Sequence, residues 1–250
     1  ERYRELFQSA DLFLCEGPHM AKELETLGCS PEKVNVLHIG VDIPALTYEP
    51  RKWAPPEPLR ILIAGSFREK KGIPDALRAL RAIRDEADLA VTIIGDADHE
   101  AASIAEKKVI LAELDRGLRG VTRLLGYRPH RELLEEAQTH HIFMSPSVTS
   151  ANGDTEGGAP VTIIEMMASG MPIVSTSHCD IPNVVRYGPT DWLVPEHDPA
   201  ALAERLRWLI GHPNGWAPML ADGRALAKAE FSLQTQASRL ADLYRALAYA

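Results

Sequence analysis

The chain has 250 residues, of which 45% are hydrophobic and 25% charged, as is typical of a soluble globular protein with one or two domains. A formal net charge of −8 without a basic stripe argues against nucleic-acid binding, and there is neither a secretory signal nor an apolar run near the roughly 20 residues of a membrane span. The three cysteines lack the paired spacing of a zinc site, so we expect reduced thiols in a cytoplasmic protein.

The first 42 residues predict two short strands around one helix. The strands are expected at 11–16 and 34–39, and the helix opens at Gly17-Pro18 and closes at Gly28, since proline suits a first helical turn and glycine ends helices. Residues 43–58 follow with prolines at 44, 50, 55, 56 and 58 and little periodicity, which is typical of a linker.

From residue 59 onward, apolar strand patterns alternate with helical ones. Strands are expected at 59–64, 90–94, 121–124, 142–144, 172–175 and 192–194, and helices at about 72–86, 98–117, 130–139, 160–169, 181–187, 198–211, 214–229 and 232–249. This alternation predicts an α/β fold with a doubly wound, Rossmann-like parallel sheet flanked by helices. Ligands bind such sheets at the carboxyl ends of the strands, so the loops after Ala64, Ile94, Leu125, Met144 and Ser175 should line the site.

The stretch 145–176 carries the strongest pattern. A strand ending before Pro146 is followed by a polar, glycine-bearing loop through Ala159, and Pro160 stands where a first-turn proline belongs. A helix over 161–168 ends at Gly170, and a strand follows. The free N–H groups at the start of this helix predict an anion-binding loop.

Glu165 lies between Ile164 and Met166 on a helix that is apolar nearly all round. A buried carboxylate without a partner is very costly, which favours a ligand role. The alternative is that Glu165 points to a wet edge or interacts with the helix dipole.

Two further loops contain candidate ligand-binding residues. In 64–72, Gly65 would let the backbone approach a ligand and Lys71 would present a cation to phosphate, whereas the alternative is a solvated turn. Tyr127 and Arg128 follow the third strand, where the pattern also fits a tight turn before a helix.

Three other groups of polar residues are given structural interpretations. Asp96-Ala97-Asp98 looks like an Asp-x-Asp metal motif but lies in a strand-to-helix turn, where Asp98 is expected to act as an N-cap. The run 177–180 holds Ser, His, Cys and Asp, but adjacent side chains do not make a catalytic triad, so it is interpreted as a loop. His140-His141 lies at a helix-to-strand junction and is taken as structural.

Several of these residues together resemble the donor-site signature of retaining glycosyltransferase family four, in the branch that builds bacterial exopolysaccharides. The residues that carry the resemblance are Glu156-Gly157, Pro160, Glu165, Met167-Ala168, Gly170 and Pro172-Ile173-Val174. The resemblance covers the chain from about Asp11 to the last helix. It implies two facing Rossmann-like domains and a nucleotide-diphosphate sugar as the substrate of a metal-independent hexosyltransferase.

The resemblance also implies roles for particular residues, among them Tyr127 and Arg128, which would stack on or hydrogen-bond the nucleobase. The donor diphosphate would be bound by Lys71 and by the N–H groups near Pro160 to Ile163, including those of Val161 and Thr162. Glu156, beside Gly157 and Gly158, would act at the sugar ring. Glu165 would accept hydrogen bonds from the ribose hydroxyls. Ser66 stands where the family has an arginine, so that cation is missing unless Arg68 reaches back. Eight residues rather than seven separate the two glutamates, and Asn183 replaces the glutamate of a His-x-Gly-Ile-Pro-Glu pattern.

The implied domain organisation makes this chain a donor-binding half. Residues 1–42 would be the remnant of an acceptor-binding domain, 43–58 the linker, 59–230 the donor-binding domain and 231–250 a C-terminal helix. The rest of the first domain, supplied in cis or in trans, would hold the sugar or lipid-linked acceptor and make any peripheral contact with a membrane. Its absence should leave an apolar face around Leu12, Leu14, Val36 and Ile39.

We therefore expect a retaining glycosyltransferase, with Lys71 and Glu156 as its catalytic residues. The rival interpretation is a non-catalytic nucleotide-sugar-binding module that acts with a partner chain, to which the departures at Ser66 and Asn183 give weight. A dehydrogenase is a weaker alternative, since no G-x-G-x-x-G follows the first strand of the alternating region.

Overall fold

A computed structural model of the protein describes residues 2–188 and 192–248 and contains two parallel sheets. The larger sheet has five strands in the order β5-β4-β3-β6-β7, all parallel. Its strands are β3 Leu59–Ala64, β4 Leu89–Ile94, β5 Thr122–Gly126, β6 Ile142–Ser145 and β7 Ile173–Ser175. This order reverses direction between β3 and β6, which is the switch point at which doubly wound sheets bind ligands.

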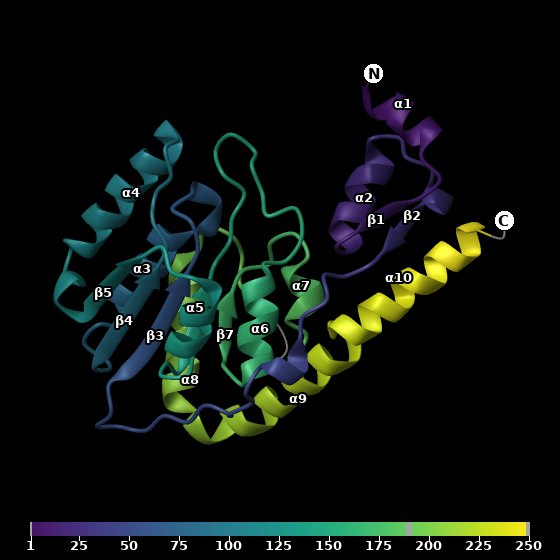
Figure 1. Cartoon of the computed structure of the whole chain (residues 1–250). Helices are drawn as coiled ribbons and strands as arrows, with labels where there is room; N and C mark the ends of the chain where they lie inside the picture. The colour runs from purple at the N-terminus through teal and green to yellow at the C-terminus, as the bar shows by residue number, and fades with distance from the viewer. Residues whose placement is uncertain (1, 189–191, 249–250) are drawn as a thin grey trace.

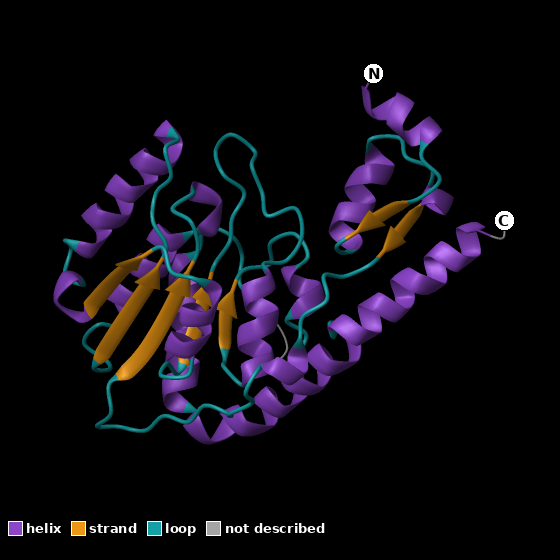
Figure 2. Ribbon diagram, in the orientation of Figure 1, coloured by secondary structure: helices purple, strands orange, loops and turns teal. Residues whose placement is uncertain are grey.

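Helices cover both faces of the five-stranded sheet (Figure 1). The helices of this unit are α3 Ile73–Ala82, α4 Ala101–Leu114, α5 His130–Ala137, α6 Val161–Ser169, α7 Ile181–Val184, α8 Pro199–Gly211 and α9 Trp216–Glu230. On one side α3 contacts both α4 and α8, and on the other α6 contacts α9. The expected doubly wound α/β fold is therefore confirmed (Figure 2).

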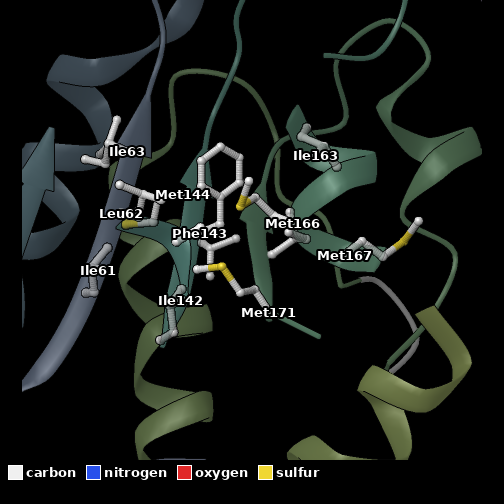
Figure 3. Close-up of a cluster of buried hydrophobic side chains, with 14 of the residues drawn as sticks. Ile61, Leu62, Ile63, Ile142, Phe143, Met144, Ile163, Met166, Met167 and Met171 are labelled. Atoms are coloured by element: carbon white, nitrogen blue, oxygen red, sulfur yellow. The ribbon is translucent and has the colours of Figure 1, made fainter. Parts of the chain in front are cut away.

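The core of this unit lies on both faces of the sheet, and one part of it lies between the sheet and α6. Ile61, Phe143 and Ile173 on three neighbouring strands are buried, and Ile163 and Met166 of α6 pack in the same cluster (Figure 3). Near-continuous apolar runs of this kind are required because both faces of a parallel sheet are covered.

The N-terminal unit is much smaller. It consists of α1 Arg2–Ser9, β1 Phe13–Cys15, α2 Pro18–Thr26 and β2 Val34–Val36, and its two strands pair in parallel with Phe13 opposite Val34. Leu14, Val36 and Ile39 are exposed, whereas Leu12 is half-buried. The expected apolar face is therefore present at three of its four positions.

The linker is fixed to the five-stranded unit rather than loose. Arg51 is buried and donates to the carbonyl oxygens of Glu49, His140, Ala137 and Ser169, the last two at the ends of α5 and α6. Single-turn 3-10 segments elsewhere are η1 Pro31–Lys33, η2 Ile43–Ala45, η3 Glu69–Lys71, η4 Arg119–Val121 and η5 Pro213–Gly215.

The last helix, α10 Leu233–Ala248, runs back toward the N-terminal unit (Figure 1). Val41 bridges Ser232, its N–H donates to the carbonyl of Phe231 (2.8 Å), and its own carbonyl accepts from the N–H of Leu233 (2.8 Å). Among the described residues, no helix is both long and apolar enough to cross a membrane.

Two expectations about the elements are wrong. Residues 192–194 form no strand, since Val194 makes only an isolated bridge to Thr176, and Trp192 is instead buried against Trp208 of α8. Asp98 is not the N-cap of α4, because that helix begins at Ala101 and Glu100 takes the cap position. The apolar run at 192–194 and the aspartate at position 98 are thus explained by side-chain contacts, and not by a strand or a helix cap.

Candidate functional site

Two loops meet at the carboxyl edge of the sheet, beside the switch point. The loop after β3 and the loop after β6 are joined by a hydrogen bond from the N–H of Val148 to the carbonyl of Lys70 (2.9 Å). Gly72 makes this approach possible, since it adopts φ +62° and a Cβ there would lie 1.9 Å from the carbonyl oxygen of Pro146. The two loops therefore form one surface.

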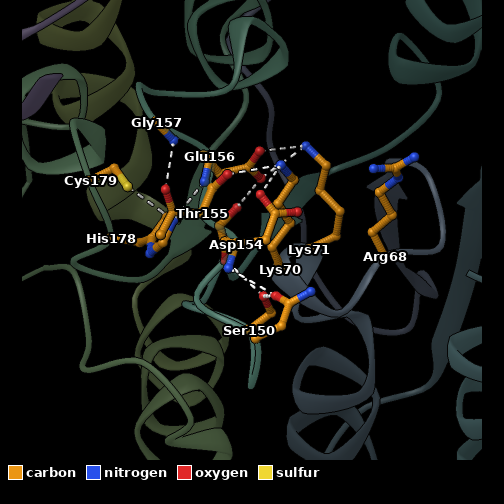
Figure 4. A network of polar contacts seen from close by, with 12 residues as sticks. Arg68, Lys70, Lys71, Ser150, Asp154, Thr155, Glu156, Gly157, His178 and Cys179 are labelled. Carbon is orange, nitrogen blue, oxygen red and sulfur yellow. Dashed lines mark hydrogen bonds and ion pairs between the residues drawn. The ribbon is translucent and has the colours of Figure 1, made fainter. Parts of the chain in front are cut away.

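Lys71 and Glu156 meet on that surface (Figure 4). Nζ of Lys71 lies 2.9 and 2.8 Å from the two carboxylate oxygens of Glu156, and Ser147 Oγ donates to the same carboxylate at 2.8 Å. The two candidate catalytic residues, which are 85 positions apart in sequence, are therefore brought into direct contact.

Gly65 and Ser66 lie beside this pair. A Cβ on Gly65 would stand 3.4 Å from the aliphatic stem of Lys71, so glycine leaves room for that stem to lie over the backbone. The Ser66 side chain is half-buried at the missing arginine position, and its carbonyl accepts from the N–H of Arg68 (2.8 Å).

Arg68 is engaged elsewhere. Its guanidinium donates to Asp98 (2.8 Å) and to Glu100 (2.9 Å), just before α4. Asp96 in turn binds Lys107 (2.6 Å), so the two aspartates of the apparent metal motif are held by two different basic residues. In this structure the Arg68 guanidinium is therefore paired with two carboxylates ahead of α4.

Glu165 faces the site from α6 and is 6% exposed. Its Oε1 lies 2.8 Å from Nε2 of His130, the first residue of α5. Burial raises the pKa of the Glu165 carboxyl, and the nearby His130 opposes this effect. His130 is a partner that the sequence interpretation missed, because nothing in the sequence pairs residues 35 positions apart.

The N-terminus of α6 points into the same region. Pro160 occupies the cap position, one place earlier than expected, and Val161 and Thr162 begin the helix. The first N–H groups of a helix have no acceptor one turn back, so they are available to an anion. Gly157 and Gly158 in the preceding loop carry the extra residue and lie near Met20 and Glu16 of the N-terminal unit.

A buried histidine supports the loop that carries Glu156. Nε2 of His178 accepts from the N–H of Glu156 (3.1 Å), so Nδ1 carries the hydrogen that is donated to Glu196 (2.7 Å). Glu196 also accepts from the N–H of Thr149 (2.6 Å), near the start of the same loop. These residues lie in three separate parts of the chain, and only the His-x-x-Ile-Pro pattern pointed to His178.

The ionisation of His178 reflects these contacts. Burial disfavours the charged imidazolium, but hydrogen bonds to the Cys179 thiol (3.1 Å) and to Glu196 raise the pKa of His178 overall. The run 177–180 is thus a loop, as expected, although the Cys179 thiol does contact its neighbour His178.

Tyr127 and Arg128 lie at the rim. Tyr127 is exposed, and Arg128 makes a long contact of 3.7 Å with Glu132. His140 and His141 are buried at the opposite end of β6, where Nδ1 of His141 accepts from the N–H of Arg60 (3.0 Å). The structural interpretation of the two histidines therefore fits their surroundings.

Known proteins share this fold. A sucrose-phosphate synthase from Thermosynechococcus elongatus superposes with a TM-score of 0.81 at 21% identity, covering 98% of this chain and 60% of that one. The Anabaena protein HepE in complex with UDP gives a TM-score of 0.84 at 17% identity, covering 98% and 66%. At these identities the likeness establishes the fold alone.

Sequence relatives are closer. The colanic acid biosynthesis glycosyltransferase WcaL of Escherichia coli, whose name is marked putative, is 33% identical over 249 residues. The amylovoran biosynthesis glycosyltransferase AmsK of Erwinia amylovora is 34% identical over 247 residues. Each match covers 98% of this chain, which spans 59% of the length of either relative. A family model described as Glycosyl transferases group 1 matches residues 58–212, and the chain therefore belongs to that family.

Proposed function

We propose that this chain is the donor-binding part of a retaining, metal-independent glycosyltransferase that uses a nucleotide-diphosphate sugar. The observation that carries the proposal is the contact between Lys71 and Glu156 beside the N-terminus of α6, the helix that also carries Glu165. A cation, free N–H groups and two carboxylates thus meet at the switch point of the sheet.

Donor binding would rearrange the Lys71–Glu156 pair. A diphosphate competes with the carboxylate for the Lys71 ammonium, and the N–H groups of Val161 and Thr162 complete its coordination. Glu156, still held by its backbone bond to His178, is then free to accept hydrogen bonds from sugar hydroxyls. Lys71 and the helix N-terminus stabilise the leaving nucleoside diphosphate as the glycosidic bond breaks, which is electrostatic catalysis.

Glu165 is suited to bind the ribose. Its carboxylate is largely buried and has one hydrogen-bond partner among the described residues, His130, so its remaining lone pairs are available to a vicinal diol. His130 orients the carboxylate before the donor arrives. Tyr127 and Arg128, at the rim beside α5, would contact the base.

The names of the similar proteins narrow the substrate class. WcaL and AmsK are named for the synthesis of exopolysaccharides, and HepE has been crystallised with UDP and with UDP-glucose. We take a UDP-hexose as the first donor to test and a sugar or lipid-linked sugar as the acceptor. The acceptor would lie on the part of the relatives' length that this chain does not span, and that part would work in the cytoplasm or at the membrane surface.

The rival function is a binding module that holds a nucleotide sugar without transferring it. Two observations favour it, namely the ion pairs of Arg68 with Asp98 and Glu100 and the serine at position 66. Both leave Lys71 without a second cation at the diphosphate, which weakens stabilisation of the leaving group.

Calorimetry with UDP and UDP-glucose, with and without a chelator, tests the proposal. We expect binding of both ligands and equal affinity in EDTA, because Lys71 and the N–H groups supply the positive charge. Loss of binding in EDTA would contradict metal independence, and no binding of any nucleoside diphosphate would contradict the site itself. Measurable donor hydrolysis would favour the transferase over the binding module.

A further inference from the structure

The helix α2 lacks a capping side chain of its own. Its N-cap residue is Gly17, in an extended conformation, and no side chain of the helix bonds its first N–H groups. Instead, the N–H of His19 donates to Oδ1 of Asp180 at 2.8 Å. Asp180 is 161 residues away, in the loop after β7. A residue of the five-stranded unit therefore caps a helix of the N-terminal unit.

Gly17 and Asp180 fit each other sterically. A Cβ on Gly17 would lie 2.2 Å from Cγ of Asp180, so any side chain at position 17 would collide with the carboxylate. Asp180 is 2% exposed, and Asn183 donates to its Oδ1 at 3.0 Å. Oδ2 is buried without a hydrogen-bond partner among the described atoms. The charge is thus kept out of water against a helix N-terminus, whose dipole favours a carboxylate.

The same end of α2 touches the loop that carries Glu156. A Cβ on Gly158 would lie 2.5 Å from Oε2 of Glu16, and one on Gly157 would lie 3.7 Å from the Met20 side chain. Residues 16–20 therefore contact both the loop after β6, which carries Glu156, and the loop after β7, which carries Asp180. The extra residue between the two glutamates lies in this contact, and Asn183, which replaces the glutamate of the family pattern, donates to the Asp180 carboxylate beside it.

We infer that Asp180 is a positioning residue that docks residues 1–42 onto the donor loops by capping α2 from the other unit. Two of the three departures from the family pattern, Asn183 and the extra loop residue, then have one explanation. Asn183 holds the Asp180 carboxylate, and the glycine-rich insertion makes room for Glu16. Docking places Glu16 and Met20 against the backbone directly after Glu156, so the geometry of the Lys71–Glu156 pair depends on a segment outside the five-stranded unit.

The test compares Asp180→Ala with Asp198→Ala, which removes the cap of α8 within a single unit (Asp198 Oδ1 accepts from Ala201 N, 2.9 Å). Two readouts are independent of any donor: amide hydrogen exchange in α2, and the reactivity of the fully buried Cys15 thiol toward DTNB. We expect Asp180→Ala to raise both rates by about fivefold or more, the usual effect of losing a cap. Asp198→Ala should raise exchange in α8 and leave α2 and Cys15 unchanged.

A second pair of variants separates capping from docking. The double variant Gly17→Ser with Asp180→Gly gives α2 a cap of its own, so α2 exchange should return toward the wild-type rate while Cys15 stays reactive. Asp180→Asn keeps the volume and the acceptor oxygen, and it should lie between the wild type and Asp180→Ala if the latter folds poorly. Unchanged α2 exchange and Cys15 reactivity in a folded Asp180→Ala protein would overturn the inference. Weakened UDP binding without either change would place Asp180 in the donor site instead.

Discussion

Both parallel sheets of this chain contain strand–helix–strand units, but they differ in how far helices cover their faces. In the larger sheet, helices cover both faces, and the central strand β3 is buried along most of its length. In the smaller sheet, α2 packs against both strands, but Leu14 is 40% exposed and Val36 is 38% exposed. The candidate site residues all come from the larger unit, and the smaller one contributes contacts that hold them. A strand–helix–strand unit is therefore not enough to form a site, because a site needs a sheet that is closed by its own helices.

The largest expected effect concerns transfer. The 250 residues should bind donor but transfer sugar about a thousandfold or more slowly than a protein that also has the N-terminal part of a relative such as WcaL, because catalysis needs donor and acceptor held together. The measurement is radiolabelled sugar transfer with that part fused or added in trans. Efficient transfer by the 250 residues alone would break the comparison, since the smaller sheet would then suffice for an acceptor.

Lys71→Ala should weaken UDP binding by about a hundredfold, because it removes a charge-assisted contact and leaves the Glu156 carboxylate facing the diphosphate. Uridine, which lacks phosphate, should bind almost as before. The matched control is Lys70→Ala, whose ammonium binds Asp154 and the Thr155 carbonyl instead. Equal losses for UDP and uridine in calorimetry would mean that Lys71 acts through the structure.

Glu165→Gln should weaken nucleoside-diphosphate binding by about tenfold or more, as expected when a charged hydrogen bond worth about 1.5–3 kcal/mol is lost. The fold should survive, because the buried carboxylate is replaced by a neutral group of the same shape. Glu135→Gln on α5, where Glu135 pairs with the exposed Arg131, is the control and should bind normally. Unchanged affinity of a folded Glu165→Gln protein would remove Glu165 from the site.

The five-stranded unit should lose stability in acid through His141. Burial and the adjacent Arg60 lower the pKa of His141 from 6.5 to about 4, so the folded state keeps it neutral where the unfolded state takes up a proton. Stability should therefore fall by roughly 2 kcal/mol as the pH drops from 6.5 to 4. Denaturant titrations should show a flatter profile for His141→Asn but not for His99→Asn, which changes an exposed histidine. Parallel profiles for all three proteins would contradict this assignment.

The smallest effect should come from the exposed face of the smaller sheet. Leu14→Glu should weaken self-association of the chain by a few-fold, since a contiguous apolar face is an association site. The matched control is Leu124→Glu, which changes another exposed leucine on an edge strand, β5, and should leave self-association unchanged. Sedimentation velocity over a concentration series measures both. A monomeric wild type would show that exposed side chains on this sheet need no partner.

The apolar pattern predicts the larger sheet well and the smaller features poorly. The sequence predicts β3 at 59–64 and it lies at Leu59–Ala64, because a strand buried on both faces reads as a near-continuous apolar run. The strand expected at 192–194 is absent because the apolar run there serves side-chain packing, as the buried Trp192 shows.

The sequence predicts individual residues of the site but not which residues they contact. The Lys71 and Glu156 positions follow from loops at strand ends and from the family resemblance, but their partners lie across the fold. His130, Glu196 and Asp180 each bond a residue in another loop or helix. No local pattern in a single sequence fixes such pairs, since they depend on how the strands are ordered in the sheet.

The buried Arg51 has a mechanical consequence. Its guanidinium anchors the linker to the ends of α5 and α6, and Arg224 holds the carbonyls of Ile43 and Leu46 in the same way. A lysine could not replace Arg51, because a single ammonium lacks the forked donors that reach four carbonyls. Residues 43–51 therefore move as part of the larger unit, and any swing of the smaller unit has to bend the chain ahead of Ile43. The proline-rich segment therefore has the composition of a linker, but two arginine side chains hold its backbone to the five-stranded unit.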